Sequence, residues 1–238
     1  MKPEVGLERC LSFINCQLQG SRGRTPAYRD GEHKRAVTIS RQAGSGAHMV
    51  AAKLAELLQA QEPPEQCPWA VFDRNLVEKV LEDHNLPSRL AKFMPEDKIS
   101  GISDTMDELF GLHPPSWTLV HKTAETILHL ADLGNVIIIG RGAALITAKL
   151  DYVFHVRLVG SVERRAQYLM LHNSLPEKAA LDLVQQEDQG RKRYLKKYFD
   201  KDVDDPLLYH LTINTDVVPY EEAARIIAGA VATKPAGA

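Results

Sequence analysis

Short β-rich runs and helical patterns alternate along most of the chain. Runs of β-branched and other apolar residues predict strands at 37–40, 69–72, 135–139, 152–158 and 211–214. Between these runs, apolar residues recur every three or four positions, which predicts helices at 49–58, 75–85, 117–133, from Ser161, from Ser174 to Phe199, and at 219–231. Alternation of this kind predicts an α/β fold with a central parallel sheet covered by helices on both sides.

Capping residues sharpen several of these boundaries. Ser116 and Ser161 can cap the helices that follow them, and Pro219 suits a first helical turn. Ser174-x-x-Glu177 has the spacing of a capping box and predicts the start of the long helix that runs to Phe199. The first 35 residues differ, because a short amphipathic pattern from Leu7 to Leu18 is followed by a polar, glycine-containing arm at 20–35.

In a parallel sheet the ligand binds beyond the carboxyl ends of the strands. The loops that follow the predicted strands should therefore share one crevice, and they lie at 40–48, 73–75, 140–143, 159–161 and 215–218. This expectation needs only the alternation of strands and helices.

Composition excludes several classes of protein. The 238 residues carry 29 basic and 31 acidic side chains, a net charge of −2, which argues against nucleic acid as the main partner. The longest apolar run, Val136 to Ile139, is far too short to span a membrane, and the N-terminus lacks the apolar stretch of a secretory signal. Three cysteines without a CxxC pair, Cys10, Cys16 and Cys67, favour reduced thiols, so a soluble cytoplasmic protein is expected.

The loop Arg41-Gln-Ala-Gly-Ser-Gly-Ala-His48 joins the first strand to the first long helix. Its two glycines allow backbone amides to turn toward an anion, and a helix N-terminus adds partial positive charge. These are the physical features of a phosphate-binding loop, although the usual pattern GxxxxGK[ST] is altered. In this loop Arg41 occupies the position of the first glycine of the pattern, Ala47 that of the lysine, and His48 that of the Ser/Thr. A glycine turn that only connects strand to helix is the alternative.

The segment Ile39 to His48 resembles the opening of the cytidylate kinase-like family, a relative of the P-loop nucleoside monophosphate kinases. The resemblance continues through further motifs of this chain: Phe72-Asp-Arg-Asn-Leu76, Val136 to Ala143, His155 to Arg165, Asp188-x-x-Arg191-x-x-Tyr194 and Asp205 to Asn214. Together they span about 37–230. The resemblance implies a three-layer P-loop-type domain at 36–232, with a helical acceptor-binding insertion at 73–115 and a lid at 165–200, between an N-terminal arm, 1–35, and a tail, 233–238.

The resemblance also implies a division of labour among the residues. ATP would bind with its phosphates on the loop, through Ser40, Arg41, Gly44, Ser45, Gly46, Ala47 and His48. Asp73, Arg74 and Arg141 would contact the acceptor, and Arg165, Asp188 and Arg191 would belong to the lid. Four arginines, Arg41, Arg141, Arg165 and Arg191, would carry catalysis, because phosphoryl transfer depends on positioning and neutralising charge. The implied reaction is transfer of the γ-phosphoryl group of ATP to CMP or dCMP, with Mg²⁺ as cofactor.

The altered loop keeps other interpretations open. Without the lysine and the Ser/Thr, the chain could be a nucleotide-binding regulatory module that lacks kinase turnover. Ser40 or Ser45 could contact the metal through water, and His48 could face either a phosphate or solvent. The chain could also phosphorylate another small acceptor. Asp73 could serve only as a helix cap, whereas Arg157, inside a strand, suits a structural pair with a carboxylate. The sequence leaves the oligomeric state, the metal ligands and the role of the N-terminal arm open.

Overall fold

The computed structural model describes residues 10, 12–17, 35–63, 66–73, 118–140 and 142–233. The predicted helix at 75–85, and all of the insertion at 73–115 except Asp73, lie outside the described residues. So do Arg74, Ser116 and Arg141.

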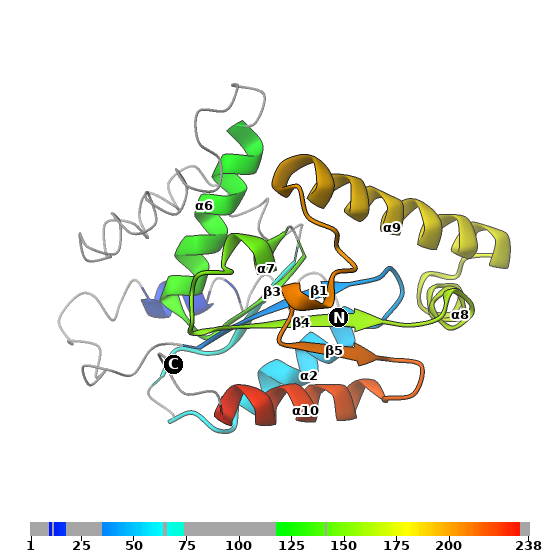
Figure 1. The fold of residues 1–238 in the computed structure, drawn as a ribbon. Coiled ribbons are helices and arrows are strands. Elements are labelled where there is room, and N and C mark those ends of the chain that lie inside the picture. The colour runs from blue at the N-terminus through cyan, green and yellow to red at the C-terminus, as the bar shows by residue number, and fades with distance from the viewer. Residues whose placement is uncertain are drawn as a thin grey trace.

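Five parallel strands form the central sheet of the described chain (Figure 1). They are β1 (Ala36–Arg41), β2 (Ala70–Phe72), β3 (Val136–Ile139), β4 (Val153–Val159) and β5 (Leu211–Asn214), in the spatial order β2-β3-β1-β4-β5. The register places Ile39 of β1 beside Ile139 of β3 and Val156 of β4, so the carboxyl ends of the three inner strands meet at one edge. The predicted α/β class and parallel sheet are confirmed.

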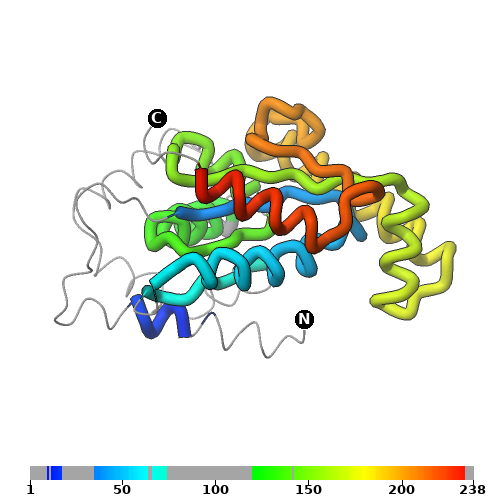
Figure 2. The backbone as a smooth tube through the Cα atoms, turned by 90° about the horizontal axis from the view of Figure 1, so that it is seen from below, coloured from blue at the N-terminus to red at the C-terminus, as the bar shows by residue number. Residues whose placement is uncertain are grey.

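Helices cover both faces of the sheet, as Figures 1 and 2 show. On one face α2 (Ala47–Gln59) packs against α10 (Tyr220–Thr233), and their buried sides share a hydrophobic cluster with β1, β3 and β4. On the other face lie α6 (Thr118–Leu133) and the short α7 (Ala143–Ile146), with their own cluster. The strand β3 reads Val-Ile-Ile-Ile and is buried throughout, because it faces both layers.

Two further helices follow β4 and extend from the carboxyl edge of the sheet (Figure 1). These are α8 (Val162–Asn173) and α9 (Glu177–Phe199), which pack together through a third cluster that includes Ala43 of the loop after β1. A 3₁₀ turn, η2 (Pro206–Leu208), then leads into β5. The region expected to be the lid, 165–200, is therefore built from most of α8 and all of α9.

The start of α9 differs from the prediction. Ser161 caps α8 as expected, accepting a hydrogen bond from the Arg164 amide at 3.4 Å. The predicted capping box at Ser174 is wrong: Ser174 has a left-handed backbone and ends α8, while Pro176 stands at the N-cap of α9 without a side-chain cap. The Leu175-Pro176 pair explains this outcome, because a residue before proline avoids helical backbone angles.

Residues 12–17 form part of the predicted N-terminal helix and pack against β2. Phe13 is fully buried and contacts Phe72 edge to face, with ring centroids 5.9 Å apart. This packing brings Cys16 to Cys67, and the two are joined in a disulfide across 51 residues. The expectation of three reduced thiols is therefore wrong for this pair, because spacing along the chain does not show which segments the fold brings together. Cys10 is a free, buried thiol.

Candidate functional site

The loop after β1, residues 41–48, has the backbone of a phosphate loop, and we use that name for it. Gly44 and Gly46 have backbone φ angles of 78° and 76°, in the left-handed region that favours glycine. Gly46 is also the N-cap of α2, so the first amides of that helix, including those of Ala47 and His48, have no intrahelical acceptor. A helix N-terminus of this kind suits an anion, and the binding of phosphate at this loop stays a prediction.

Two helices of the same chain, α8 and α10, pack directly against the two glycines. A Cβ atom at Gly44 would overlap the backbone oxygen of Arg165, and one at Gly46 would overlap the ring of Tyr220. Any side chain at these positions would force the loop away from α8 and α10. The glycines therefore serve both the turn and the close contact with these two helices.

Hydrogen bonds tie the base of the phosphate loop to the end of β4. The Gln42 amide donates to the Leu158 carbonyl at 3.0 Å, and the Gln42 side-chain oxygen accepts from the Gly160 amide at 3.0 Å. The Ser45 hydroxyl donates to the Gln42 carbonyl at 2.9 Å, and Ser45 is buried. Ser45 thus supports the loop from within.

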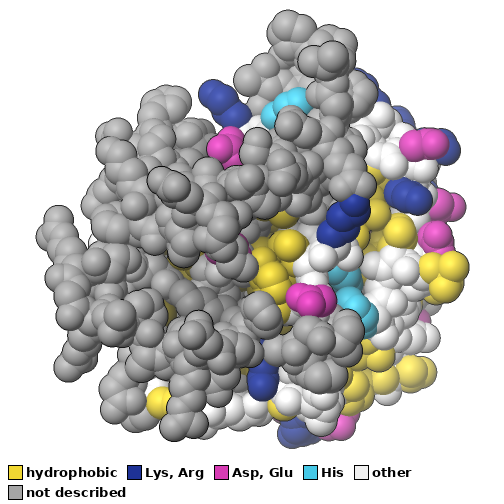
Figure 3. All heavy atoms as spheres, turned by 60° about the vertical axis from the view of Figure 1, so that its left-hand side comes forward, with side chains coloured by type: hydrophobic (Ala, Val, Ile, Leu, Met, Phe, Trp, Pro, Cys, Tyr) yellow, Lys and Arg dark blue, Asp and Glu magenta, His cyan; other side chains and the backbone are white. Residues whose placement is uncertain are grey.

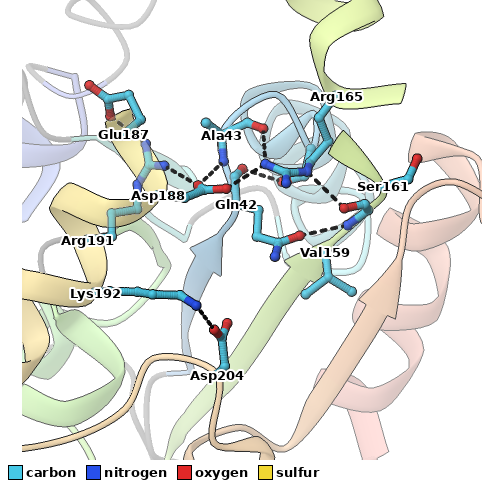
Figure 4. A network of polar contacts seen from close by, with 12 residues as sticks. Gln42, Ala43, Val159, Ser161, Arg165, Glu187, Asp188, Arg191, Lys192 and Asp204 are labelled. Atoms are coloured by element: carbon cyan, nitrogen blue, oxygen red, sulfur yellow. Dashed lines mark hydrogen bonds and ion pairs between the residues drawn. The ribbon is translucent and has the colours of Figure 1, made fainter. Parts of the chain in front are cut away.

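Arg165 lies beneath the loop with its side chain only 5% exposed. Its Nε donates to the Gly160 carbonyl at 2.9 Å, and its Nη1 donates to the Ala43 carbonyl at 3.0 Å and to Asp188 Oδ2 at 2.6 Å (Figure 4). The resemblance to the family implies a catalytic role for Arg165. The structure shows it holding the phosphate loop to α8 and α9.

Asp188 and Arg191 lie on one side of α9 and face the loop and its neighbours. Asp188 Oδ1 accepts from the Ala43 amide at 2.7 Å and from Arg191 Nη1 at 3.0 Å. Arg191 Nη2 donates to Glu187 at 2.8 Å, and its side chain is 22% exposed. Three of the predicted site residues, Arg165, Asp188 and Arg191, are thus brought together in one polar network.

A second network lies at the ends of β1 and β4. Arg157 is buried and donates to Ser40 Oγ at 3.0 Å and to Asp204 Oδ1 at 2.5 Å, which confirms its predicted structural pairing with a carboxylate. Ser40 Oγ also lies 3.2 Å from the hydroxyl of Tyr209. Burial opposes ionisation of Asp204, but the hydrogen bonds and charges of Lys192 and Arg157 outweigh it and hold the pKa of Asp204 below its ordinary value.

The carboxyl edge of the sheet borders a cavity of about 340 Å³ between the strand ends and α9. The ends of β1 and β3 and the start of α7 form one wall, and a stripe along α9 forms the other. Its polar lining includes Ser40, Arg41, Glu187, Arg191 and Tyr209. Two arginines beside a partly apolar cavity suit a small ligand that carries negative charge.

Arg41 extends from the end of β1 toward the Gly140-Arg-Gly142 turn. A Cβ atom at Gly140 would overlap Arg41 Nη1, so the glycine makes room for the guanidinium. Gly142 is packed closely against Phe199, because a Cβ atom at Gly142 would lie only 2.9 Å from the ring of Phe199. Arg141, between these glycines, lies outside the described residues, and its predicted role stays a prediction.

His48 and Asp73 meet on the β2 side of the phosphate loop. His48 Nε2 lies 3.2 Å from Asp73 Oδ2, with the two side chains 51% and 24% exposed. The contact joins the position that replaces the usual Ser/Thr to the expected acceptor-binding carboxylate. Nothing in the spacing of the two residues along the chain indicated this pair.

Several residues at the site were given no individual role from the sequence. Gln42, Asp204 and Tyr209 hold the strand ends and the loop, and Tyr194 lines the cavity. Asp204 and Tyr209 fall in or beside the Asp205-to-Asn214 motif, which was the available signal. Asp216 accepts from the Ser161 amide at 2.8 Å, and this backbone hydrogen bond, with the nearby arginines, lowers the pKa of Asp216.

The surface charges of the described residues are mixed. Among the described residues on the face seen in Figure 3, acidic, basic and histidine side chains are interspersed around exposed hydrophobic surface. The basic residues Lys192 and Lys196 of α9 pair with Asp204 and Asp200. Within the described ranges, no helix is long and apolar enough to cross a membrane, and no three His, Cys, Asp or Glu side chains gather as metal ligands.

Comparison with known proteins identifies the same family that the sequence motifs resemble. A model of the cytidylate kinase-like family matches residues 36–217. The fold is shared with an uncharacterised protein from Eubacterium ventriosum ATCC 27560, at 21% identity and a TM-score of 0.61, covering 84% of this chain and 99% of that one. A shikimate kinase from Bacteroides thetaiotaomicron is a more distant match, at 10% identity and a TM-score of 0.45, covering 83% of this chain and 98% of that one. No curated protein matches the chain.

Proposed function

This chain belongs to the cytidylate kinase-like family, and we propose that it transfers the γ-phosphoryl group of ATP to a nucleoside monophosphate, with CMP or dCMP as the acceptor. Family membership supports ATP-dependent phosphoryl transfer as the general reaction, and hence a kinase. The nucleotide acceptor comes from the likeness to cytidylate kinases and is the finer part of the proposal.

The cavity beside the phosphate loop is the observation that carries this proposal. It lies at the carboxyl edge of the sheet, where ligands of parallel α/β folds bind. Arg41 and Arg191 line it and supply permanent positive charge for an acceptor phosphate. Tyr194 and the apolar wall suit the less polar part of the acceptor.

In the proposed mechanism the phosphate loop binds ATP through backbone amides rather than through a loop lysine. The amides at the start of α2 face the phosphates, and the helix dipole adds to the attraction. Arg41 and Arg191 then orient the acceptor phosphate toward the γ-phosphoryl group. The acceptor oxygen already carries negative charge, so positioning and charge neutralisation provide the catalysis without a strong general base.

The residues at the site fit a Mg²⁺ ion held mainly by substrate. Kinase sites bind Mg²⁺ through one or two carboxylates, waters and phosphate oxygens. Asp73 provides a partly exposed carboxylate beside the phosphate loop, while His48, in the usual Ser/Thr position, is a poorer ligand for this hard cation. Bound there, Mg²⁺ would neutralise phosphate charge.

A product assay with the purified chain, ATP and Mg²⁺ tests the proposal. CMP, dCMP, UMP, AMP and GMP are offered separately, and ATP binding is measured in parallel by calorimetry. The expected result is a nucleoside diphosphate from CMP or dCMP. Product from a different acceptor would keep the kinase and replace its substrate. If ATP does not bind and no acceptor gives a product, both the kinase activity and the proposed acceptor are contradicted.

The altered phosphate loop favours one alternative function, a nucleotide-binding module without turnover. Ala47 cannot supply the charge of the usual lysine, and His48 is engaged with Asp73. This alternative predicts saturable ATP binding and no diphosphate product at high protein concentration, whichever acceptor is supplied.

A further inference from the structure

Asp188 joins α9 to the phosphate loop through the backbone of Ala43. Its Oδ1 accepts from the Ala43 amide at 2.7 Å, while its Oδ2 accepts from Arg165 at 2.6 Å. Arg165 in turn donates to the Ala43 carbonyl at 3.0 Å. Both polar groups of one loop residue are therefore satisfied by side chains from α8 and α9 (Figure 4).

These hydrogen bonds fix the loop at Ala43 and leave the backbone amides at the start of α2 available for a ligand. Ala43 is buried, and it packs in the same cluster as Ala166, Leu169 and Val184 of the two helices. The amides at the start of α2 lie on the other side of the two glycines. The carboxylate of Asp188 is accompanied by two guanidinium groups, so its own charge is offset near the phosphate site.

The same carboxylate also orients an arginine of the cavity. Arg191 Nη1 donates to Asp188 Oδ1 at 3.0 Å, and Arg191 lines the acceptor cavity. Glu187 provides a comparison within the molecule, because it binds the other Nη of Arg191 at 2.8 Å along the same helix. Its described hydrogen bond stays within α9, whereas those of Asp188 extend to the loop and to α8.

We propose that Asp188 is a positioning residue that fixes the phosphate loop at Ala43 and aims Arg191 at the cavity, so that one carboxylate couples the ATP site to the acceptor site. The coupling rests on the proposed function, whereas the fixing of the loop does not. ATP that binds the ordered loop favours the arrangement in which Arg191 is aimed, so each ligand should strengthen the binding of the other.

Amide hydrogen exchange on the full, ligand-free chain tests the fixing of the loop. In Asp188→Ala the Ala43 amide should exchange about 10-fold faster or more than in the wild type, since it loses a charged hydrogen-bond acceptor. Amides of β1 and β3 report whether the core is intact. Glu187→Gln should leave Ala43 exchange unchanged. Equal exchange in Asp188→Ala and the wild type, or an equal rise in Glu187→Gln, would overturn the proposal.

Calorimetry with Asp188→Asn, which preserves the side-chain shape, tests the coupling. In the wild type and in Asp182→Asn, a change at an exposed carboxylate of the same helix, saturating CMP should tighten ATP binding about 10-fold, a coupling of ordinary size. In Asp188→Asn this factor should fall to within about twofold of one. Full coupling in Asp188→Asn would overturn the coupling role. A wild type that binds no ATP would contradict the proposed function, while the exchange experiment would still decide whether Asp188 fixes the loop.

Discussion

The two sides of the carboxyl edge are built differently. On the β4 side, polar contacts to Arg165 and Asp188 hold the phosphate loop, and most of these groups are buried. On the β2 side, stabilisation comes from aromatic packing of Phe13 on Phe72 and from a disulfide, and the polar pair there, His48 with Asp73, is 51% and 24% exposed.

The difference separates residues that shape the site from residues that face a ligand. Arg165 of α8 and Arg191 of α9 both stand in motifs shared with the family, but the guanidinium of Arg165 is buried under the loop and that of Arg191 lines the cavity. A sequence motif identifies both as arginines of a phosphate site. Only their surroundings show that Arg165 contacts the loop whereas Arg191 lines the cavity, which is where the proposed function places the acceptor.

The largest expected effect concerns the β2 side. Cys16→Ser removes a cross-link that closes a loop of 51 residues, so the free energy of unfolding should fall by about 4 kcal/mol. Denaturant titration of the oxidised wild type and the variant measures the change. Reductant should destabilise the wild type and leave the variant unaffected. A wild type indifferent to reductant would show that the disulfide does not stabilise this side.

On the β4 side, Arg165→Met should lower the free energy of unfolding by about 3 kcal/mol, because it removes one partner of a buried ion pair. Denaturant titration again measures the effect. Arg164→Met, an exposed neighbour on α8, is the matched control and should change stability by less than about 0.5 kcal/mol. Similar stability in the two variants would contradict the buried role of Arg165.

Arg191→Met should affect catalysis much more than stability, in contrast to Arg165→Met. The unfolding free energy should change by less than about 1 kcal/mol, since the side chain is partly exposed. kcat/KM for the acceptor should fall about 100-fold, because a charged contact to the acceptor phosphate is lost. Steady-state kinetics with Arg193→Met, an exposed residue of the same helix, as control separates the two effects. An unchanged kcat/KM would remove Arg191 from the site.

Acid should weaken the β4 side at a low pH. The pKa values of Asp204 and Asp216 are held below their ordinary values, so both carboxylates stabilise the fold above the unfolded-state pKa of about 3.9. That contribution disappears as pH falls through the lower, folded-state pKa values. Unfolding measured from pH 6 to pH 3 should depend less on pH in Asp204→Asn than in the wild type. Equal slopes would contradict this assignment.

Much of the fold could be predicted from the sequence. The five strands follow from short apolar runs, and the parallel arrangement follows from their alternation with helices. The start of α9 was missed because a capping-box pattern competes with Pro176, which prevents Ser174 from opening the helix. The pairing of Cys16 with Cys67 was missed because it depends on how the N-terminal helix packs on β2.

The candidate site could be predicted in part. The glycines of the loop and the residues Arg165, Asp188 and Arg191 were singled out from the sequence, and the structure brings them together. Their individual functions depend on burial and direction, which a motif does not contain. The contact of His48 with Asp73 joins two segments that only the sheet order β2-β3-β1 places near each other.

Arg41 gives the most direct test of this division of the site. The resemblance to the family implies that Arg41 binds the phosphates of ATP, whereas the structure places its guanidinium against Gly140, at the cavity. Calorimetry of ATP and of CMP with Arg41→Met distinguishes the two roles. We expect CMP affinity to fall about 100-fold while ATP affinity changes less than about threefold. A large loss of ATP affinity with CMP binding intact would contradict the assignment of this cavity to the acceptor.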